Sequence, residues 1–165
     1  MTIQEYKDTL KNPLREMTEV FLIKGDQIML GIKKTGFGQG NLVGIGGKLE
    51  KDEKIEEAAK REFLEETEAR VNDLKLVATL DCYFPHNEEW NQKIYTYFSK
   101  KWEGEIKETK EIQPIWFNIA EIPFEKMWDD VQYWLPFALD SRELKAEFLF
   151  NEDLKVVDYH LVFNS

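Results

Sequence analysis

The sequence of 165 residues is poor in the residues that form disulfides or zinc sites. It contains one cysteine, Cys82, and two histidines, His86 and His160. One cysteine cannot form an internal disulfide, and a Cys/His zinc centre needs three or four such ligands. We therefore expect neither a disulfide framework nor a structural zinc site.

Long apolar runs and a basic surface are also missing. Residues 1–20 carry Lys, Glu, Asp and Arg without an apolar stretch, so they resemble neither a secretory signal nor a membrane span. We expect a cytoplasmic protein without a membrane partner. The formal net charge of −10 argues against binding to long nucleic acid, which needs basic side chains to displace counterions. A polyphosphate ligand would need a local basic pocket or divalent cations to offset the acidic field.

The apolar content is sufficient for one hydrophobic core. Apolar residues make up 42% of the chain and aromatic residues 13%. At this length the chain can bury one core and is too short for two. We expect a single domain over residues 1–165, acting as a monomer.

The order of predicted elements favours an α/β (α+β) fold. A hairpin is expected at residues 20–23 and 27–32, around a turn that contains Gly25. Helices are expected at 53–67 and 130–139, where Pro136 should kink or shorten the second. Further strands are expected at 76–84, 93–100 and 115–118, with a closing hairpin at 146–150 and 154–163. A mixed sheet packed between two helices fits this order best.

A glycine-rich stretch, TGFGQGNLVGIGGK, follows the first hairpin. It holds six glycines from Gly36 to Gly47. Such a backbone can bring its amides close to a ligand. Taken alone, the stretch fits a flexible connection between strands equally well.

The helix expected at 53–67 places carboxylates on the face that should be buried. At about 100° per residue, Glu62 and Glu66 lie in the middle of an apolar stripe and Glu65 lies at its edge. The stripe consists of Ile55, Ala58, Ala59 and Phe63. A solvated charged helix is the common alternative. Buried carboxylates within one turn repel one another, however, and oxygen ligands at this spacing suit a hard cation such as Mg²⁺ or Mn²⁺. Arg61 is one cation beside three anions.

Residues 47–69, GKLEKDEKIEEAAKREFLEETEA, resemble the Nudix box G-x5-E-x7-R-E-U-x-E-E-x-G-U. Its pattern positions are occupied by Gly47, Glu53, Arg61, Glu62, Phe63, Glu65 and Glu66. Two terminal positions depart from the pattern, because Glu68 replaces the final glycine and Ala69 is a small version of the final aliphatic residue. That glycine would end the helix as a left-handed cap, so we expect its loss to affect helix termination more than chemistry.

The resemblance covers nearly the whole chain and is closest to the 8-oxo-dGTP diphosphatase branch of the Nudix hydrolases. Residues 33–40, KKTGFGQG, resemble the loop of that branch before the box, and residues 122–136, IPFEKMWDDVQYWLP, resemble its base-binding segment. The resemblance implies the Nudix fold, a mixed sheet sandwiched between α-helices. It also implies metal-dependent hydrolysis of a nucleoside triphosphate, such as the oxidised purine 8-oxo-dGTP, to the monophosphate and pyrophosphate, in sanitation of the nucleotide pool.

Two alternatives remain open at this point. Val43 stands where that branch has a base-reading asparagine, and Val131 stands where it has a second aspartate, so another modified purine triphosphate is an alternative substrate. A nucleotide-binding or metal-binding module without turnover is the alternative from another class. The intact carboxylates Glu62, Glu65 and Glu66 argue against it.

By the same resemblance, the catalytic residues are Arg61, Glu62, Glu65 and Glu66. A Mg²⁺ site, with Mn²⁺ as a substitute, is implied at Glu62, Glu65, Glu66, Glu111 and the backbone carbonyl of Gly46. Glu66 is the first candidate for the general base, with Glu62 or Glu111 as alternatives. We expect Glu53 and Arg61 to pair and to hold the helix and the loop in register.

The nucleotide-binding residues implied by the resemblance are Thr18, Lys33, Phe37, Gly46, Gly47, Lys48, Trp128, Asp129 and Asp130. We expect Trp128 to stack on the base, with core packing as the alternative, and Trp134 to belong to the core. Asp130 is expected to bond the purine edge. Asp129 would replace the missing second aspartate by a slip of one residue.

Overall fold

The computed structural model describes residues 1–164, so the last position of the expected domain, residue 165, lies outside the described part. Its main sheet is formed by β1 (Arg15–Lys24), β2 (Gln27–Lys33), β3 (Leu42–Val43), β5 (Lys75–Tyr83), β6 (Gln92–Ser99), β8 (Ile112–Asn118), β9 (Leu144–Phe150) and β10 (Val156–Phe163). Seven of the eight strands follow the order β10-β9-β5-β6-β1-β2-β3, and the eighth, β8, pairs with β2. The pairs β1–β6 and β5–β9 are parallel and the other pairs are antiparallel, so the expected mixed sheet is confirmed.

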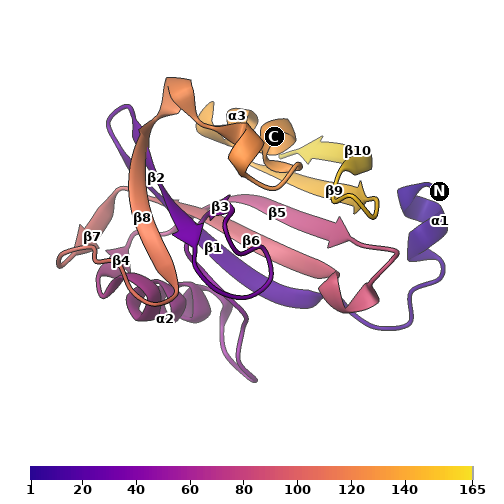
Figure 1. The fold of residues 1–165 in the computed structure, drawn as a ribbon, viewed down its shortest axis with the longest axis horizontal. Coiled ribbons are helices and arrows are strands. Elements are labelled where there is room, and N and C mark those ends of the chain that lie inside the picture. The colour runs from indigo at the N-terminus through magenta and orange to yellow at the C-terminus, as the bar shows by residue number, and fades with distance from the viewer. Residues whose placement is uncertain (165) are drawn as a thin grey trace.

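Helices α2 (Ile55–Thr67) and α3 (Val131–Leu139) lie on opposite faces of this sheet (Figure 1). The alternation of side chains along β1 explains the two cores. Val20 and Leu22 pack with Phe63 of α2, whereas Phe21 packs with Trp134 of α3. The predicted sandwich of a sheet between two helices is therefore correct.

The predicted hairpins and helices match the structure closely. The first hairpin is β1–β2, with Ile23 opposite Ile28, and the closing hairpin is β9–β10. Helix α2 begins two residues later than expected, and α3 continues through Pro136 to Leu139, the expected end. Proline therefore does not shorten α3 on its C-terminal side.

Several short elements were not expected from the sequence. They are α1 (Ile3–Lys7), the short strand β3 inside the glycine-rich stretch, the two-stranded sheet of β4 (Arg70–Asn72) and β7 (Lys101–Glu103), and the 3₁₀ turns η1 (Glu88–Trp90), η2 (Ile119–Glu121) and η3 (Phe124–Lys126). Helix α1 opens with a capping box between Thr2 and Glu5 and buries Ile3 and Tyr6. It is too short for hydrophobic periodicity to reveal it.

Helix α2 ends where the sequence motif predicts, although glycine is absent from its C-cap. Glu68 adopts the left-handed conformation with φ of 64°, and its N–H donates to the carbonyl of Leu64 at 2.9 Å. This conformation costs a residue with a side chain roughly 1–2 kcal/mol. Glu68, in place of the glycine of the Nudix pattern, therefore leaves the end of α2 unchanged and lowers its stability somewhat.

Within residues 1–164, no helix combines the length and the apolar composition that crossing a membrane requires.

Candidate active site

A cavity of about 360 Å³ lies beside β1, where the glycine-rich stretch meets α2 and the segment before α3. Two glycines allow this close approach. A Cβ on Gly46 would lie 1.8 Å from the carbonyl oxygen of Thr18, and a Cβ on Gly47 would lie 2.5 Å from the carboxylate carbon of Glu62. A side chain at Gly46 would push the loop away from the backbone of β1, whereas one at Gly47 would displace the carboxylate of Glu62.

The buried face of α2 carries carboxylates, as its sequence pattern predicts. Phe63 of the apolar stripe is fully buried, and Glu62 and Glu66 beside it are half-buried. Glu65 is exposed, with 57% of its side chain accessible. The predicted position of Glu62 and Glu66 within the stripe, and of Glu65 at its edge, is therefore confirmed.

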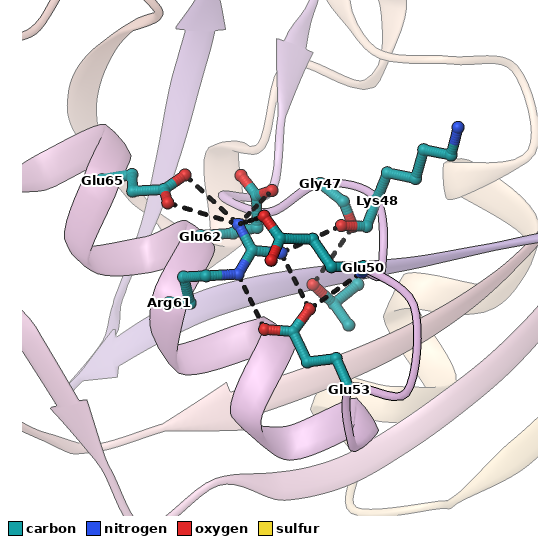
Figure 2. A network of polar contacts seen from close by, with 8 residues as sticks. Gly47, Lys48, Glu50, Glu53, Arg61, Glu62 and Glu65 are labelled. Carbon is teal, nitrogen blue, oxygen red and sulfur yellow. Dashed lines mark hydrogen bonds and ion pairs between the residues drawn. The ribbon is translucent and has the colours of Figure 1, made fainter.

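The guanidinium of Arg61 lies at the centre of an ion-pair network (Figure 2). Its Nε and Nη2 atoms donate to the two carboxylate oxygens of Glu53 at 2.7 and 2.9 Å, and Nη2 also donates to the carbonyl of Lys48 at 3.1 Å. Its Nη1 atom donates to Glu62 at 3.0 Å and to Glu65 at 3.3 Å. The predicted Glu53–Arg61 pair is thus present, and it joins α2 to the loop. Hydrogen bonding by Arg61 lowers the pKa of Glu53 to about 2.

Glu66 points to the cavity without such a partner. Burial, together with the charges of Glu62 and Glu111, raises its pKa to about 8, although Lys33 offsets part of the rise. Glu111 lies in the loop just before β8, on the same cavity, and accepts a hydrogen bond from the Thr35 hydroxyl at 3.0 Å. The structure therefore brings together carboxylates from α2 and from a loop 45 residues farther along the chain, since Glu111 follows Glu66 by that number.

The chemistry of these donors fits a hard divalent cation. Carboxylate oxygens are preferred ligands of such ions, and the burial and crowding that raise the pKa of Glu66 indicate a site with too little positive charge. Within residues 1–164, however, no three acidic, histidine or cysteine side chains already converge as a ligand group. Arg61 explains part of this, because it engages both Glu62 and Glu65.

Aromatic rings line the other end of the cavity. The ring centroid of Phe37 lies 4.4 Å from that of Trp90 and 4.9 Å from that of Trp128. Trp128 is half-buried and faces the cavity. Gly38 (φ 85°) lies against it, since a Cβ there would be 3.1 Å from the indole. The glycine-rich loop thus holds Phe37 between two indoles.

Asp130 joins this aromatic end to the core. Its side chain is buried and on the cavity, and its Oδ2 accepts a hydrogen bond from the indole N–H of Trp134 at 2.9 Å. Burial raises the pKa of Asp130 to about 6. Trp134 is fully buried, which confirms its predicted place in the core.

Residues 13–137 match the NUDIX domain, which is more than half of the chain. The chain belongs to the Nudix hydrolase family. It is 33% identical to the oxidized purine nucleoside triphosphate hydrolase of Mus musculus over 147 residues, which cover 89% of this chain and 94% of the mouse protein. It is 34% identical to the protein of the same name from Danio rerio over 145 residues, which cover 88% and 92% of the two chains.

The fold agrees with this Nudix membership. The crystal structure of a MutT protein from Bacillus halodurans superposes with a TM-score of 0.75 and 25% sequence identity. The superposition covers 90% of this chain and 97% of the bacterial one. Nudix hydrolases generally use a divalent metal ion, which agrees with the carboxylate-rich end of the cavity.

Most nucleotide-binding residues expected for this Nudix chain lie on one cavity. They are Thr18, Lys33, Phe37, Gly46, Gly47, Lys48, Trp128 and Asp130. Of the expected metal ligands, Gly46, Glu66 and Glu111 line the cavity, whereas Glu62 and Glu65 lie behind it with Arg61. Val43 and Val131 also line it, so the two positions that depart from the family branch face the same space.

The placement of Asp129 in the pocket is corrected by the structure. Asp129 does not line the cavity of this Nudix hydrolase. Its carboxylate accepts hydrogen bonds from the backbone N–H of Val156 at 2.8 Å and from the side-chain amide of Gln132 at 2.8 Å. These bonds tie the start of α3 to β10, so Asp129 does not replace the missing second aspartate.

Sequence reasoning missed Glu19, which lines the same cavity. Its carboxylate accepts a hydrogen bond from the Thr96 hydroxyl at 2.8 Å, and burial raises its pKa to about 7. The signal was present in the sequence, because the two-residue period of β1 puts Glu19 on the face of Phe21 and Ile23, which are buried. A carboxylate on a buried strand face, like one on a buried helix face, indicates a candidate ligand site.

Proposed function

We propose that this Nudix hydrolase cleaves an oxidised purine nucleoside triphosphate, such as 8-oxo-dGTP, to the monophosphate and pyrophosphate, and so removes damaged precursors from the nucleotide pool. The observation that carries the proposal is one cavity with two unlike ends. Glu66 and Glu111 line its acidic end, and Phe37 and Trp128 line its aromatic end. The names of the mouse and zebrafish relatives support the same substrate class.

The two ends match the two halves of a nucleotide. Aromatic rings offer stacking surfaces to any base, and a polyphosphate needs positive charge beside carboxylates. We take residues 1–165 as one Nudix domain, which agrees with a main sheet whose strands run from Arg15 to Phe163. A cytoplasmic monomer is part of this proposal, and a single buried cysteine is compatible with that compartment.

Glu62, Glu65, Glu66, Glu111 and the carbonyl of Gly46 would hold Mg²⁺, with Mn²⁺ as a substitute. When bound, the metal neutralises phosphate charge and lowers the pKa of water. Arg61 keeps α2 and the loop together through Glu53 and the Lys48 carbonyl, which fixes the ligands of both segments relative to each other. Lys33 adds positive charge beside Glu66.

Glu66 is the general base in this proposal. It is the one carboxylate of α2 on the cavity, and Arg61 does not engage it. A carboxylate oxygen of Glu66 accepts the proton of the attacking water. Glu111, which also lines the cavity, is the second candidate, and Glu62 is the third because Arg61 already occupies one of its oxygens.

At the aromatic end, Trp128 stacks on the base and Asp130 bonds its edge. Val43 and Val131 face the cavity without hydrogen-bonding groups. This observation supports a second candidate substrate, a purine triphosphate modified in another way, since a pocket with fewer polar partners rejects fewer analogues.

A turnover panel tests the proposed function. The purified protein is given Mg²⁺ with 8-oxo-dGTP, dGTP, an N-methylated purine triphosphate or dATP, and pyrophosphate and orthophosphate are both measured. We expect pyrophosphate as the product and the highest kcat/KM for 8-oxo-dGTP. A preference for the methylated nucleotide would select the second candidate. Release of orthophosphate, or of neither product, would contradict the proposal.

A further inference from the structure

Glu19 lies on the face of β1 that also carries Phe21 and Ile23, on the side of the sheet that packs against α3. Arg15 is on the same face of the strand and lines the same cavity as Glu19. Asp130 also lines this cavity, so the two carboxyl groups belong to one pocket with Trp128.

The hydrogen bonding of Glu19 leaves one oxygen for a ligand. Its Oε1 accepts from the Thr96 hydroxyl, which the parallel register of β1 and β6 places directly opposite. No hydrogen bond from residues 1–164 reaches Oε2, and this atom is not among the buried polar atoms that lack a partner. Since Glu19 lines the cavity, Oε2 is accessible from that space.

No lysine or arginine of the described residues forms an ion pair with Glu19, although Arg15, Lys33 and Lys48 line the same cavity. Within the described residues 1–164, neither Glu19 nor Asp130 takes part in a salt bridge. Gly44 packs against Glu19, since a Cβ there would approach the Cβ of Glu19 to 3.1 Å. Glu19 therefore lies next to Val43, whose side chain offers no hydrogen bond.

We propose that Glu19 is a specificity-determining residue, which together with Asp130 selects bases whose edge presents two adjacent N–H donors. Guanine and its C8-oxidised form have this edge, in the ring N1–H and the exocyclic 2-amino group. Ionised carboxylates only accept hydrogen bonds, so two neighbouring acceptors match two neighbouring donors. Adenine presents an unprotonated ring N1 beside its amino group. This nitrogen is a hydrogen-bond acceptor and would face a carboxylate oxygen, which is also an acceptor, so the two would repel each other. The inference rests on the proposed function for the nature of the ligand.

The test compares guanine with adenine nucleotides that are either both oxidised at C8 or both unmodified. For the wild-type protein with Mg²⁺, the specificity constant kcat/KM is measured with each nucleotide. The value for 8-oxo-dGTP is divided by the value for 8-oxo-dATP, and the same ratio is taken for dGTP and dATP. We expect both ratios to exceed about 10, because a site built for particular hydrogen bonds rejects a base that cannot make them. Glu19→Gln should lower the ratios at least about tenfold, since its amide turns an N–H donor toward the cavity when its oxygen replaces Oε1 at Thr96.

Glu16→Gln is the matched control. Glu16 is also on β1, its carboxylate also accepts a hydroxyl hydrogen bond at 2.8 Å, from Tyr95, and it does not line the cavity. The base ratios should be unchanged in this variant. Glu19→Leu is the second variant, and melting temperatures of all three show that each is folded.

Equilibrium binding separates this inference from the proposed function. Calorimetric titration with 8-oxo-dGMP and 8-oxo-dAMP reports base preference without turnover. A wild type that hydrolyses no triphosphate but binds the guanine monophosphate more tightly, with that preference lost in Glu19→Gln, would contradict the proposed function and support the role of Glu19. A wild type without guanine preference, or folded Glu19 variants that keep it, would overturn the role of Glu19.

Discussion

The Arg61 network beside the cavity and the base end of the cavity differ in how they accommodate negative charge. In the network, the guanidinium of Arg61 binds Glu53 through two hydrogen bonds and lowers its pKa to about 2. At the base end, neutral donors take this place, the Thr96 hydroxyl for Glu19 and the indole of Trp134 for Asp130. Burial outweighs these neutral hydrogen bonds, which offset only part of the cost of burying a charge, and the two pKa values rise to about 7 and about 6.

This difference separates structural carboxylates from those that remain open to a ligand. Glu53 has its charge balanced within the protein and joins two segments. The carboxylates of Glu66, Glu19 and Asp130, in contrast, line the cavity. Nearby cationic side chains do not balance their negative charge, as the raised pKa of Glu66 shows. We therefore expect ligands to complete both ends, a cation at Glu66 and base N–H groups at Glu19 and Asp130.

Metal removal should have the largest effect on activity, and it should affect the acidic end of the cavity but not the base end. Excess chelator is expected to abolish pyrophosphate release, because carboxylates and a polyphosphate cannot share a site without counter-charge. Added Mg²⁺ should restore it. Binding of a nucleoside monophosphate at Trp128 should persist in chelator. Undiminished turnover with chelator in excess and Mg²⁺ absent would refute the metal mechanism.

Glu66→Gln comes next in expected size. It keeps the shape of the side chain and removes its charge, so kcat should fall by at least about 10²-fold, as expected for loss of a ligand or a base. The melting temperature without metal should rise, because repulsion with Glu62 and Glu111 is relieved. Glu57→Gln, on the exposed side of α2, is the control for both measurements. Near-normal turnover in Glu66→Gln would show that the acidic end is not the reaction site.

Trp128→Ala tests the base end. Loss of stacking should weaken substrate binding by about 1 to 3 kcal/mol, seen as a raised KM, while metal binding stays intact. Trp102→Ala is the control, since Trp102 packs against Trp116 at 5.8 Å between ring centroids and does not line the cavity. It should lower the melting temperature without changing KM. The same behaviour in Trp128→Ala would assign Trp128 to the core.

The pH dependence of stability should have opposite signs for Asp130 and for Glu53. The pKa of Asp130 is raised from 3.8 to about 6, so between these values the folded protein holds a proton that the unfolded chain releases. The free energy of unfolding therefore falls as pH rises through this window, by at most about 3 kcal/mol, and Glu19 extends the fall toward pH 7. The pKa of Glu53 is lowered from 4.5 to about 2, so its contribution is present above pH 4.5 and is lost as pH falls toward 2.

Urea unfolding across this pH range measures both slopes. Asp130→Asn should flatten the slope between about pH 4 and pH 6, and Glu53→Gln should flatten the slope below about pH 4.5. If both variants changed the slope in the same pH range, the contrast between Asp130 and Glu53 would be wrong.

Glu68→Gly should have the smallest effect and should spare both ends. Glycine adopts the left-handed conformation of Glu68 without strain, so we expect a gain of about 1 kcal/mol, or roughly 2–4 °C in melting temperature, with unchanged kcat and KM. Glu57→Gly, inside α2, should instead lose about 1 kcal/mol. A loss of stability in Glu68→Gly would mean that the Glu68 side chain stabilises the end of the helix.

The acidic end could be predicted from the sequence because its parts are close together in the chain. Glu53, Arg61, Glu62 and Glu66 lie on one helix and the turn before it, and the 3.6-residue period alone shows which side chains share a face. The base end was predicted less completely. Trp128 and Asp130 came from one segment, whereas Glu19 needed β1 to be recognised as a strand that begins at Arg15, before the expected start at residue 20, and is buried on both faces.

The sequence by itself therefore determined the mixed sheet between two helices, the carboxylates buried on α2 and the Glu53–Arg61 pair. The sheet, the helices and the buried carboxylates follow from periodicity and spacing, which are local properties of a chain, whereas the pair was expected from the resemblance to the Nudix box. Only the tertiary structure decided that Glu19 faces Thr96 and Asp130, and that Asp129 turns away to cap the backbone of Val156. These contacts depend on which strands pair and in what register, and long-range pairing is set by burial of the whole core rather than by neighbours in sequence.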